Sequence, residues 1–313
     1  MKGALVTGAT TPVGAELVRS LLSNDDKPMV LAIGAEDRPD ILPLEHPRLA
    51  YRCLDLTRER NIRRLLFADA KDLGIDVVIH GALHRSAHET GPRVHRLNVD
   101  TTRALLRLSE RHPTIKRFIY RSYAEVYRIS HEQPDLVGED HPLDFRDRVP
   151  QRVRDRIEAD VTVCAQIGMS TLHIVVLRCA EVVAPHTGSQ LWDYLQSRVC
   201  FRPWGFDPMI NVLSVDDAVR AIGLAITTGA QGVFNVPGKD SLPLSRIIEK
   251  YQRVTVPIPG ALMRPLYYLR HRTVGREFHY DLSRRRFHFS GILDGARASA
   301  ELGYSPSTPI DWL

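Results

Sequence analysis

The sequence has few cysteines, and none of the spacings that would tie the chain to a disulfide framework or a metal. Its 313 residues include four cysteines, Cys53, Cys164, Cys179 and Cys200, and no two of them form a C-x-x-C pair. The 13 histidines show no H-E-x-x-H spacing. We therefore predict no metal site and expect the cysteines to be unreactive thiols inside the core.

Long apolar runs are also missing. No stretch reaches the roughly 20 apolar residues that a membrane-spanning helix needs, and Gly8 interrupts the first apolar run before a signal-peptide core could form. Hydrophobic residues make up 43% of the chain and charged residues 25%, which are the proportions of an ordinary globular protein. These features predict a folded, cytoplasmic protein.

Lysine is scarce. Only six of the 42 basic residues are lysines, so the formal net charge of +5 rests on arginine. Guanidinium groups suit phosphates and carboxylates, which would fit an anionic partner. A genome rich in G and C would give the same composition without such a partner.

Short apolar runs alternate with segments that have the spacing of amphipathic helices. The predicted strands cover residues 3–7, 29–33, 50–53, 76–80, 117–121 and 172–177, and the predicted helices cover 13–22, 58–73, 94–111 and 151–166. This alternation predicts an α/β protein with a doubly wound parallel sheet. Frequent prolines beyond Pro185 predict a smaller C-terminal α/β lobe.

The first predicted strand ends in a turn between two glycines and is followed directly by a helix. In a βαβ unit this turn places backbone N–H groups and a helix N-terminus against a pyrophosphate. Its position after a strand and before a helix is the context that the motif requires. The residues predicted to bind the dinucleotide here are Gly8, Thr10, Thr11, Pro12, Val13 and Gly14.

Eight landmarks in chain order resemble those of the extended short-chain dehydrogenase/reductase family of NAD(P)-dependent sugar-nucleotide epimerases and dehydratases. Residues 7–14 resemble its TGxxGxxG turn, 77–82 its VVIHLAA strand end, 98–102 its NVxGT helix start and 118–127 its FVYxSSxxVYG strand. The others are Asp55 with Leu56 and residues 177–185, 211–218 and 234–238. The resemblance implies a Rossmann domain, NAD or NADP as cofactor and a nucleotide sugar or a similar anionic small molecule as ligand.

The resemblance also implies domains and further cofactor contacts. Residues 1–182 and 207–234 would form the dinucleotide-binding domain, and residues 183–206 and 235–313 the substrate-binding lobe. Gly34 stands where the family places an acid for the NAD ribose, with Glu36 and Arg38 just beyond, so the choice between NAD and NADP stays open. The added cofactor contacts are Asp55, Leu56, His80, Gly81, Ala82 and Asn98, although His80 at a buried strand end also fits a structural role.

Two residues of the first turn depart from the family pattern. Thr11 replaces a glycine that lets the backbone approach phosphate, and Pro12 has no N–H to donate. Losing one charge-assisted hydrogen bond costs about 1.5–3 kcal/mol. Pro12 is also a favourable first residue of a helix, so both interpretations are compatible.

The Y-x-x-x-K pair with which the family moves protons and hydride is absent from the whole chain. Arg152 and Arg156 occupy its positions, and arginine neither gives up nor accepts a proton at neutral pH. Tyr123 occupies the position of the assisting serine, with Ser122 on the opposite face of the strand. In the sequence alone, all three catalytic positions are altered.

Arg152 and Arg156 lie one helical turn apart and would face the cofactor cleft together. Two cations there need an anion between them, which suggests a phosphate or carboxylate ligand. Alternatively, both side chains reach solvent or pair with Asp155, Glu158 or Asp160.

Three hypotheses about function follow. The first is a degenerate family member that binds a dinucleotide or another anionic nucleotide ligand without ordinary hydride chemistry and acts as a regulatory or scaffolding subunit. The second is an active, atypical oxidoreductase or epimerase that uses Tyr123 or Tyr127, with Arg156 in the place of the lysine. The third is a nucleic-acid or membrane-surface binder that uses the arginines and aromatics of residues 267–289. A homodimer through helices 94–111 and 151–166 is compatible with each of them.

Overall fold

The computed structural model describes residues 1–24, 26–274 and 277–312. Its centre is a seven-stranded sheet in the order β11-β7-β5-β4-β1-β2-β3, in which every neighbouring pair is parallel. The prediction of a doubly wound parallel sheet is therefore confirmed. The strands are β1 (Gly3–Thr7), β2 (Met29–Gly34), β3 (Leu49–Cys53), β4 (Val77–His80), β5 (Arg117–Tyr123), β7 (His173–Cys179) and β11 (Gly232–Val236).

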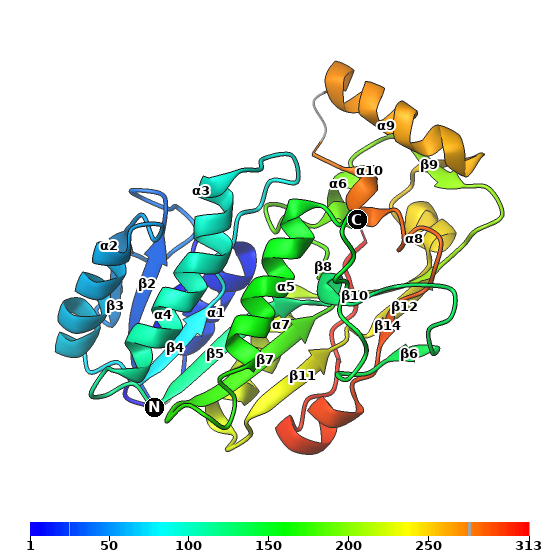
Figure 1. Ribbon diagram of the computed structural model, residues 1–313. Coiled ribbons are helices and arrows are strands. Elements are labelled where there is room, and N and C mark those ends of the chain that lie inside the picture. The colour runs from blue at the N-terminus through cyan, green and yellow to red at the C-terminus, as the bar shows by residue number, and fades with distance from the viewer. Residues whose placement is uncertain (25, 275–276, 313) are drawn as a thin grey trace.

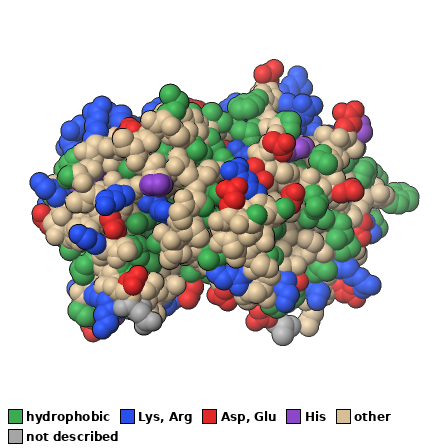
Figure 2. Space-filling view, turned by 90° about the horizontal axis from the view of Figure 1, so that it is seen from below, with side chains coloured by type: hydrophobic (Ala, Val, Ile, Leu, Met, Phe, Trp, Pro, Cys, Tyr) green, Lys and Arg blue, Asp and Glu red, His purple; other side chains and the backbone are tan. Residues whose placement is uncertain are grey.

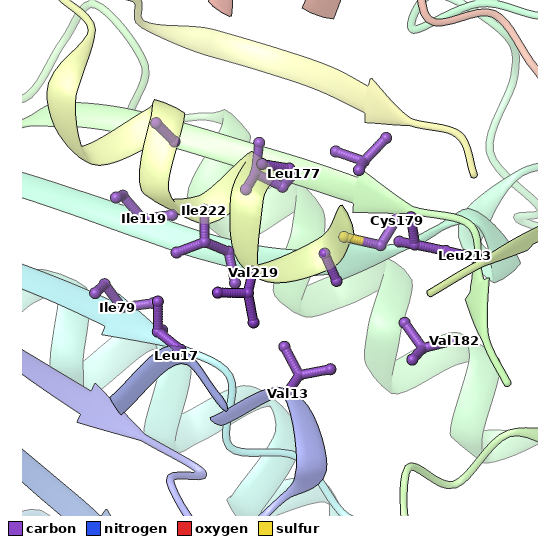
Figure 3. Packing of buried hydrophobic residues seen from close by; sticks show 14 of the residues in the cluster. Val13, Leu17, Ile79, Ile119, Leu177, Cys179, Val182, Leu213, Val219 and Ile222 are labelled. Carbon is purple, nitrogen blue, oxygen red and sulfur yellow. The ribbon is translucent and has the colours of Figure 1, made fainter. Parts of the chain in front are cut away.

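Helices cover both faces of this sheet (Figure 1). One face carries α2 (Glu59–Arg64), α4 (Thr101–Glu110) and α5 (Gln151–Cys164), and the other carries α1 (Pro12–Leu22) and α7 (Val215–Thr227). Because both faces are covered, the central strands are buried along almost their whole length. Figure 3 shows the core between the sheet and the helices α1 and α7. This core includes Val13, Leu17, Ile79, Ile119, Leu177, Val219 and Ile222.

Two of the predicted helices contain π-helical turns that the sequence pattern does not reveal. The predicted helix 58–73 is α2 followed by the π turn η1 (Leu65–Ala70). The predicted helix 94–111 consists of α3 (Pro92–His95), the π turn η2 (Arg96–Asp100) and α4. Such turns occur frequently at functional sites, and η2 carries Asn98.

Smaller elements follow the central sheet in the C-terminal part of the chain. A second apolar cluster lies there, separate from the core of the central sheet. Its larger side chains include Leu191, Tyr194, Leu195, Tyr267, Phe278, Tyr280 and Phe287. Within the described residues, no helix combines the length and apolar character needed to cross a bilayer. The remaining elements are η3 (Ala124–Val126), β6 (Leu136–Val137), β8 (Glu181–Val182), α6 (Gln190–Leu195), β9 (Val199–Pro203), β10 (Met209–Leu213), β12 (Asp240–Pro243), α8 (Leu244–Lys250), β13 (Val254–Ile258), α9 (Gly260–Val274), α10 (Tyr280–Ser283), β14 (Ile292–Leu293) and the π turn η4 (Ala298–Leu302).

The cysteines only partly meet the expectation of core thiols. Cys179 and Cys200 are buried and Cys164 is partly buried, whereas Cys53 is exposed. Cys53 ends β3, an edge strand of the sheet whose last two residues, Arg52 and Cys53, are exposed. The expectation is therefore wrong for Cys53.

A buried hydrogen-bond network joins the carboxyl ends of β1 and β4 to α4. The Nδ1 of His80 lies 2.7 Å from Thr7 Oγ1, and its Nε2 lies 2.9 Å from Thr102 Oγ1. Thr7 Oγ1 also accepts from the backbone N–H groups of Gly81 and Ala82, at 3.2 Å each. This network fixes the edge of the sheet at which ligands bind in doubly wound folds.

Because His80 is fully buried, we predict that it makes the stability of the protein depend on pH. Burial lowers the pKa of His80 to about 3, whereas an unfolded histidine has a pKa of about 6.5. The unfolded state therefore binds a proton first as the pH falls through that window, and the stability due to neutral His80 is lost. We expect this residue to lower the free energy of unfolding by about 2 kcal/mol between pH 7 and pH 5.

Urea denaturation of His80→Gln and wild type at both pH values checks this. The variant should show the smaller loss of stability, while His173→Gln, at an exposed histidine, should behave like wild type. An unchanged pH dependence in His80→Gln would contradict the assignment.

Candidate functional site

The first turn is folded tightly against its neighbours. Gly8 has a φ of +73°, and a Cβ there would lie 2.8 Å from the carbonyl oxygen of Gly81. A Cβ on Gly14 would lie 2.2 Å from the carbonyl oxygen of Gly8. Both positions therefore require glycine.

Thr11 and Pro12, the two departures from the family pattern, form the start of α1. Thr11 is the N-cap, and its Oγ1 accepts from the N–H of Gly14 at 3.1 Å. Pro12 is the first helical residue, which fits its fixed φ and missing N–H. In the described part of the chain, the N–H groups of Thr10 and Val13 have no hydrogen-bond partner. The turn thus offers two backbone donors to a phosphate at a helix N-terminus.

The end of β2 is tightly packed around Gly34. A Cβ on Gly34 would lie 2.4 Å from Thr10 Cγ2 and 2.5 Å from the hydroxyl oxygen of Tyr51. Tyr51 and Thr10 therefore fill the space that a side chain at this position would need. Burial raises the pKa of Tyr51 to about 12, and its neutral hydroxyl donates to the carbonyl oxygen of Glu36.

Glu36 and Arg38 are both exposed beyond this strand end. The side chain of Glu36 lies 4.0 Å from that of Arg85, in the loop after β4. Because Glu36 and Arg38 both follow this strand end, an acid suited to NAD and an arginine suited to NADP are both present there.

The other residues expected to contact the cofactor fall into two groups. Leu56, His80 and Asn98 are nearly or fully buried, so their side chains pack inside the protein. Asn98 Oδ1 accepts from the N–H of His84 at 2.9 Å, and its Nδ2 donates to Asp155 at 3.2 Å.

Asp55 belongs to the second group and is exposed. Its carboxylate accepts from the N–H and hydroxyl of Thr57, at 3.0 and 2.6 Å, and these bonds contribute to lowering its pKa. Gly81 and Ala82 follow β4, and their backbone is held in place by hydrogen bonds from both N–H groups to Thr7 Oγ1.

Arg152 and Arg156, on α5, are both almost completely buried, with 6% and 3% of their surfaces exposed. Arg156 Nη1 donates to Glu125 Oε2, and Arg152 Nε lies 3.6 Å from the same oxygen. Arg152 also donates to the carbonyl oxygens of Arg85 and Gly188, at 2.8 and 2.5 Å. The two arginines therefore bind an internal carboxylate.

This arrangement corrects two expectations. The arginines neither reach solvent nor pair with the acids on their own helix, because Asp155 contacts His95, Glu158 pairs with Arg103 and Asp160 pairs with Arg178. The anion between them is a protein side chain from η3, where the sequence suggested a ligand. We name the group Arg152, Arg156 and Glu125 the ion cluster.

Glu125 stays ionised in this setting. Burial raises the pKa of its carboxyl, but the guanidinium groups of Arg156, Arg152 and Arg286 outweigh burial and hold the pKa at about 2. The ion cluster therefore contains no group that exchanges a proton near neutral pH.

Three neighbouring side chains of the strand end are also held in place. The guanidinium of Arg156 lies 3.8 Å from the ring centroid of Tyr123, and Arg121 Nη1 lies 3.4 Å from the Tyr123 hydroxyl. Ser122 donates to the buried Asp160 on α5.

Tyr127 is the second tyrosine that could have served as an acid or base. Its hydroxyl donates to Asn235 Oδ1 at 2.6 Å and accepts from Arg178 at 3.1 Å. Burial raises the pKa of Tyr127 to about 12. Its hydroxyl therefore stays protonated and occupied at neutral pH.

A cavity of about 1100 Å³ lies beside the ion cluster, between the start of α5 and the segment that follows α9. Arginine dominates its lining, and in the described chain Arg148 and Arg284 make no ion pair. This volume suits an anionic ligand as large as a nucleotide sugar. The charged and histidine residues of its lining are Glu125, His131, Asp144, Arg146, Asp147, Arg148, Arg264, His279, Asp281, Arg284, Arg285, Arg286 and His288.

The family model named NAD dependent epimerase/dehydratase family matches residues 4–236. An uncharacterized protein of Mycobacterium tuberculosis (strain ATCC 25618 / H37Rv) is 28% identical over 314 residues, which cover 97% of this chain and 80% of that protein. The family match agrees with the resemblance drawn from the eight sequence landmarks.

Two solved structures share the fold. A UDP-glucuronic acid 4-epimerase from Bacillus cereus in complex with NAD is 20% identical, has a TM-score of 0.72 and matches 98% of this chain and 94% of its own. A UDP-glucose 4-epimerase from Thermotoga maritima with UDP-glucose is 17% identical, has a TM-score of 0.74 and also matches 98% and 94%. At these identities the likeness concerns the fold alone.

The ion cluster predicts that Glu125→Gln strongly destabilises the protein. Removing one partner of a buried ion pair leaves an uncompensated charge and costs about 3–5 kcal/mol. Glu158→Gln provides the matched control, because Glu158 pairs with Arg103 on the surface, where such pairs contribute about 0–1 kcal/mol. Urea denaturation at pH 7 measures both. Equal losses of stability in the two variants would refute the cluster.

Proposed function

Because this chain belongs to the NAD dependent epimerase/dehydratase family, we propose that it binds a dinucleotide and a nucleotide sugar without carrying out the Tyr-Lys hydride chemistry. The observation that carries this proposal is the ion cluster, since the carboxylate of Glu125 binds both arginines at the proposed catalytic positions. Neither Arg152 nor Arg156 can accept or release a proton at neutral pH. The protein then acts as a ligand-dependent regulatory or scaffolding subunit.

Residues of the first turn support the dinucleotide part of the proposal. The free N–H groups of Thr10 and Val13 would hold the pyrophosphate at the start of α1, while Gly8 allows the close approach. Glu36 would accept from the ribose hydroxyls, or Arg38 would bind a 2′-phosphate. A bound nicotinamide would supply a hydride acceptor or donor.

The arginine-lined cavity supports the nucleotide-sugar part. Arg148 and Arg284 are available for the phosphates, because the other arginines of the lining already have partners in the protein. We assign residues 183–206 and 235–313 to the substrate lobe on this basis. The strand β11 ends at Val236, so two of its residues lie beyond the proposed boundary.

Tyr123 carries a second candidate function, the active atypical enzyme. Its hydroxyl lies 3.4 Å from Arg121 Nη1 and makes no other hydrogen bond in the described chain, so a cation faces it. This candidate requires turnover that depends on Tyr123.

The aromatics of residues 267–289 give the nucleic-acid hypothesis little support. Four of the six, Tyr267, Phe278, Tyr280 and Phe287, are at most 5% exposed and pack in the second apolar cluster, whereas stacking on bases needs exposed rings. Of the other two, Tyr268 is 63% exposed and Phe289 is partly buried. Figure 2 shows Lys and Arg side chains interspersed with Asp and Glu on one face of the molecule.

A homodimer through α4 and α5 remains part of the proposal. The two helices pack side by side and are joined by Arg103 and Glu158, at 3.1 Å. Val161 and Phe145, 39% and 71% exposed, border a hollow along α5 and offer apolar area to a second copy.

We predict binding without turnover. Calorimetric titration should give micromolar dissociation constants for NAD(H) or NADP(H), and single-turnover mixing of the NAD⁺-loaded protein with UDP-glucose should give no absorbance change at 340 nm and no UDP-galactose. A product that forms in wild type and disappears in Tyr123→Phe would establish the active enzyme instead. Failure of all four cofactors to bind at millimolar concentration would contradict the dinucleotide site.

We also predict that Arg284→Gln weakens the binding of UDP by about tenfold or more, because a charge-assisted hydrogen bond to phosphate contributes about 1.5–3 kcal/mol. Arg103→Gln removes an arginine outside the cavity and should change the affinity less than twofold. Equal affinities of wild type and Arg284→Gln would remove the phosphates from this part of the cavity.

A further inference from the structure

A second, much smaller cavity lies between the end of β5, α5 and the turn at residues 187–189. Its volume is about 20 Å³, which is room for one water-sized atom. It borders the large cavity, since Glu125 and Arg286 line both. The residues that line it are Arg121, Tyr123, Ala124, Glu125, Arg152, Arg156, Cys179, Glu181, Val182, Thr187, Gly188, Ser189 and Arg286.

The charges around this cavity do not balance. Four guanidinium groups face two carboxylates, and both carboxylates already have partners. Glu125 belongs to the ion cluster. Glu181 accepts from Ser189 Oγ and from the N–H of Leu191, at 2.8 Å each, and lies 3.7 Å from Arg286. Neither carboxylate is left for Arg121.

Arg121 is a buried cation without a counter-ion in the described chain. Only 6% of its surface is exposed, and no carboxylate lies within 4.0 Å of it. Its Nη1 reaches the hydroxyl of Tyr123 and its guanidinium contacts the thiol of Cys179, whereas its buried Nε makes no hydrogen bond. Arg156 Nε is buried and unpartnered as well. A buried, unpaired charge is costly, and an unfilled guanidinium donor set is suited to an oxyanion.

We propose that this cavity binds one oxygen of an oxyanion group of a ligand, a carboxylate or a phosphate, between Arg121 and Arg156. The cavity holds a single oxygen, so the rest of the ligand lies in the large cavity. This inference rests on the proposed function, and it narrows the ligand to a nucleotide sugar that carries an acidic group on the sugar. The diphosphate binds Arg284 and Arg148, and the acidic group binds Arg121.

The experiment compares UDP-glucuronic acid with UDP-glucose, two ligands that differ in one carboxylate. Calorimetry on wild type should give about tenfold tighter binding of the acid, the value of one charge-assisted hydrogen bond. Arg121→Met should bring the two affinities together and leave that of UDP within twofold. Arg121→Lys keeps the charge and should retain part of the preference, and Arg103→Met, on the surface of α4, should retain all of it.

Stability gives a second readout. Arg121→Met removes an unpaired buried cation, and methionine replaces the aliphatic part of the arginine side chain. The ligand-free variant should therefore have a higher Tm than wild type. A lower Tm would show that Arg121 has a stabilising partner and would count against the proposal. Equal affinities for the two ligands in wild type, or a preference that survives Arg121→Met, would overturn it.

The failure of the nucleotide site is distinguishable from that of the oxyanion site. If UDP and both sugars fail to bind, the proposed function is wrong in that part, and sodium formate at constant ionic strength becomes the probe. A saturable rise in Tm that is lost in Arg121→Met would support an oxyanion site for a free small carboxylate. No rise in wild type would overturn the oxyanion site itself.

Discussion

The buried carboxylate of Glu125 is the group on which the rest of the site depends. Two guanidinium groups from α5 converge on it, and Arg152 extends the contact to the loops that contain Arg85 and Gly188. An ionised carboxylate in this position needs those cations to offset its desolvation, and the cations need the carboxylate. The cluster therefore fixes the start of α5 against the end of β5, at the two positions where the sequence resemblance would place the family's tyrosine and lysine.

Much of the fold could be predicted because it is encoded locally. The order of strands and helices and the eight family landmarks predicted the parallel sheet and the first turn, and each of the six predicted strands lies within two residues of its observed bounds. The short strands β6, β8 and β9 were not predicted. The π turns η1 and η2 were not predicted, because one inserted residue hardly disturbs an amphipathic pattern. The exposure of Cys53 escaped because a strand pattern does not say which strand is at the edge.

The site could be predicted only in part, because it depends on contacts between distant residues. The sequence identified Arg152 and Arg156 and the need for an anion between them. It assigned that anion to a ligand or to acids on the same helix, whereas Glu125 comes from the turn after β5. The sequence did contain a signal, because Glu125 stands between apolar and aromatic residues at positions 123–127. An acid in such a segment calls for a cation as its partner. Tyr51, which fills the position beside Gly34, gave no comparable signal.

The charge state of Glu125 is the most direct test of this account. Infrared spectroscopy of protein with isotope-labelled glutamate, with Glu125→Gln to assign the band, reports whether this carboxyl is ionised. With its pKa held at about 2, Glu125 should show only the carboxylate band down to pH 4, where an ordinary glutamic acid, with a pKa of about 4.3, is more than half protonated. A protonated band with a midpoint near that ordinary value would mean that the arginines do not hold Glu125, and that the catalytic positions are free for other chemistry.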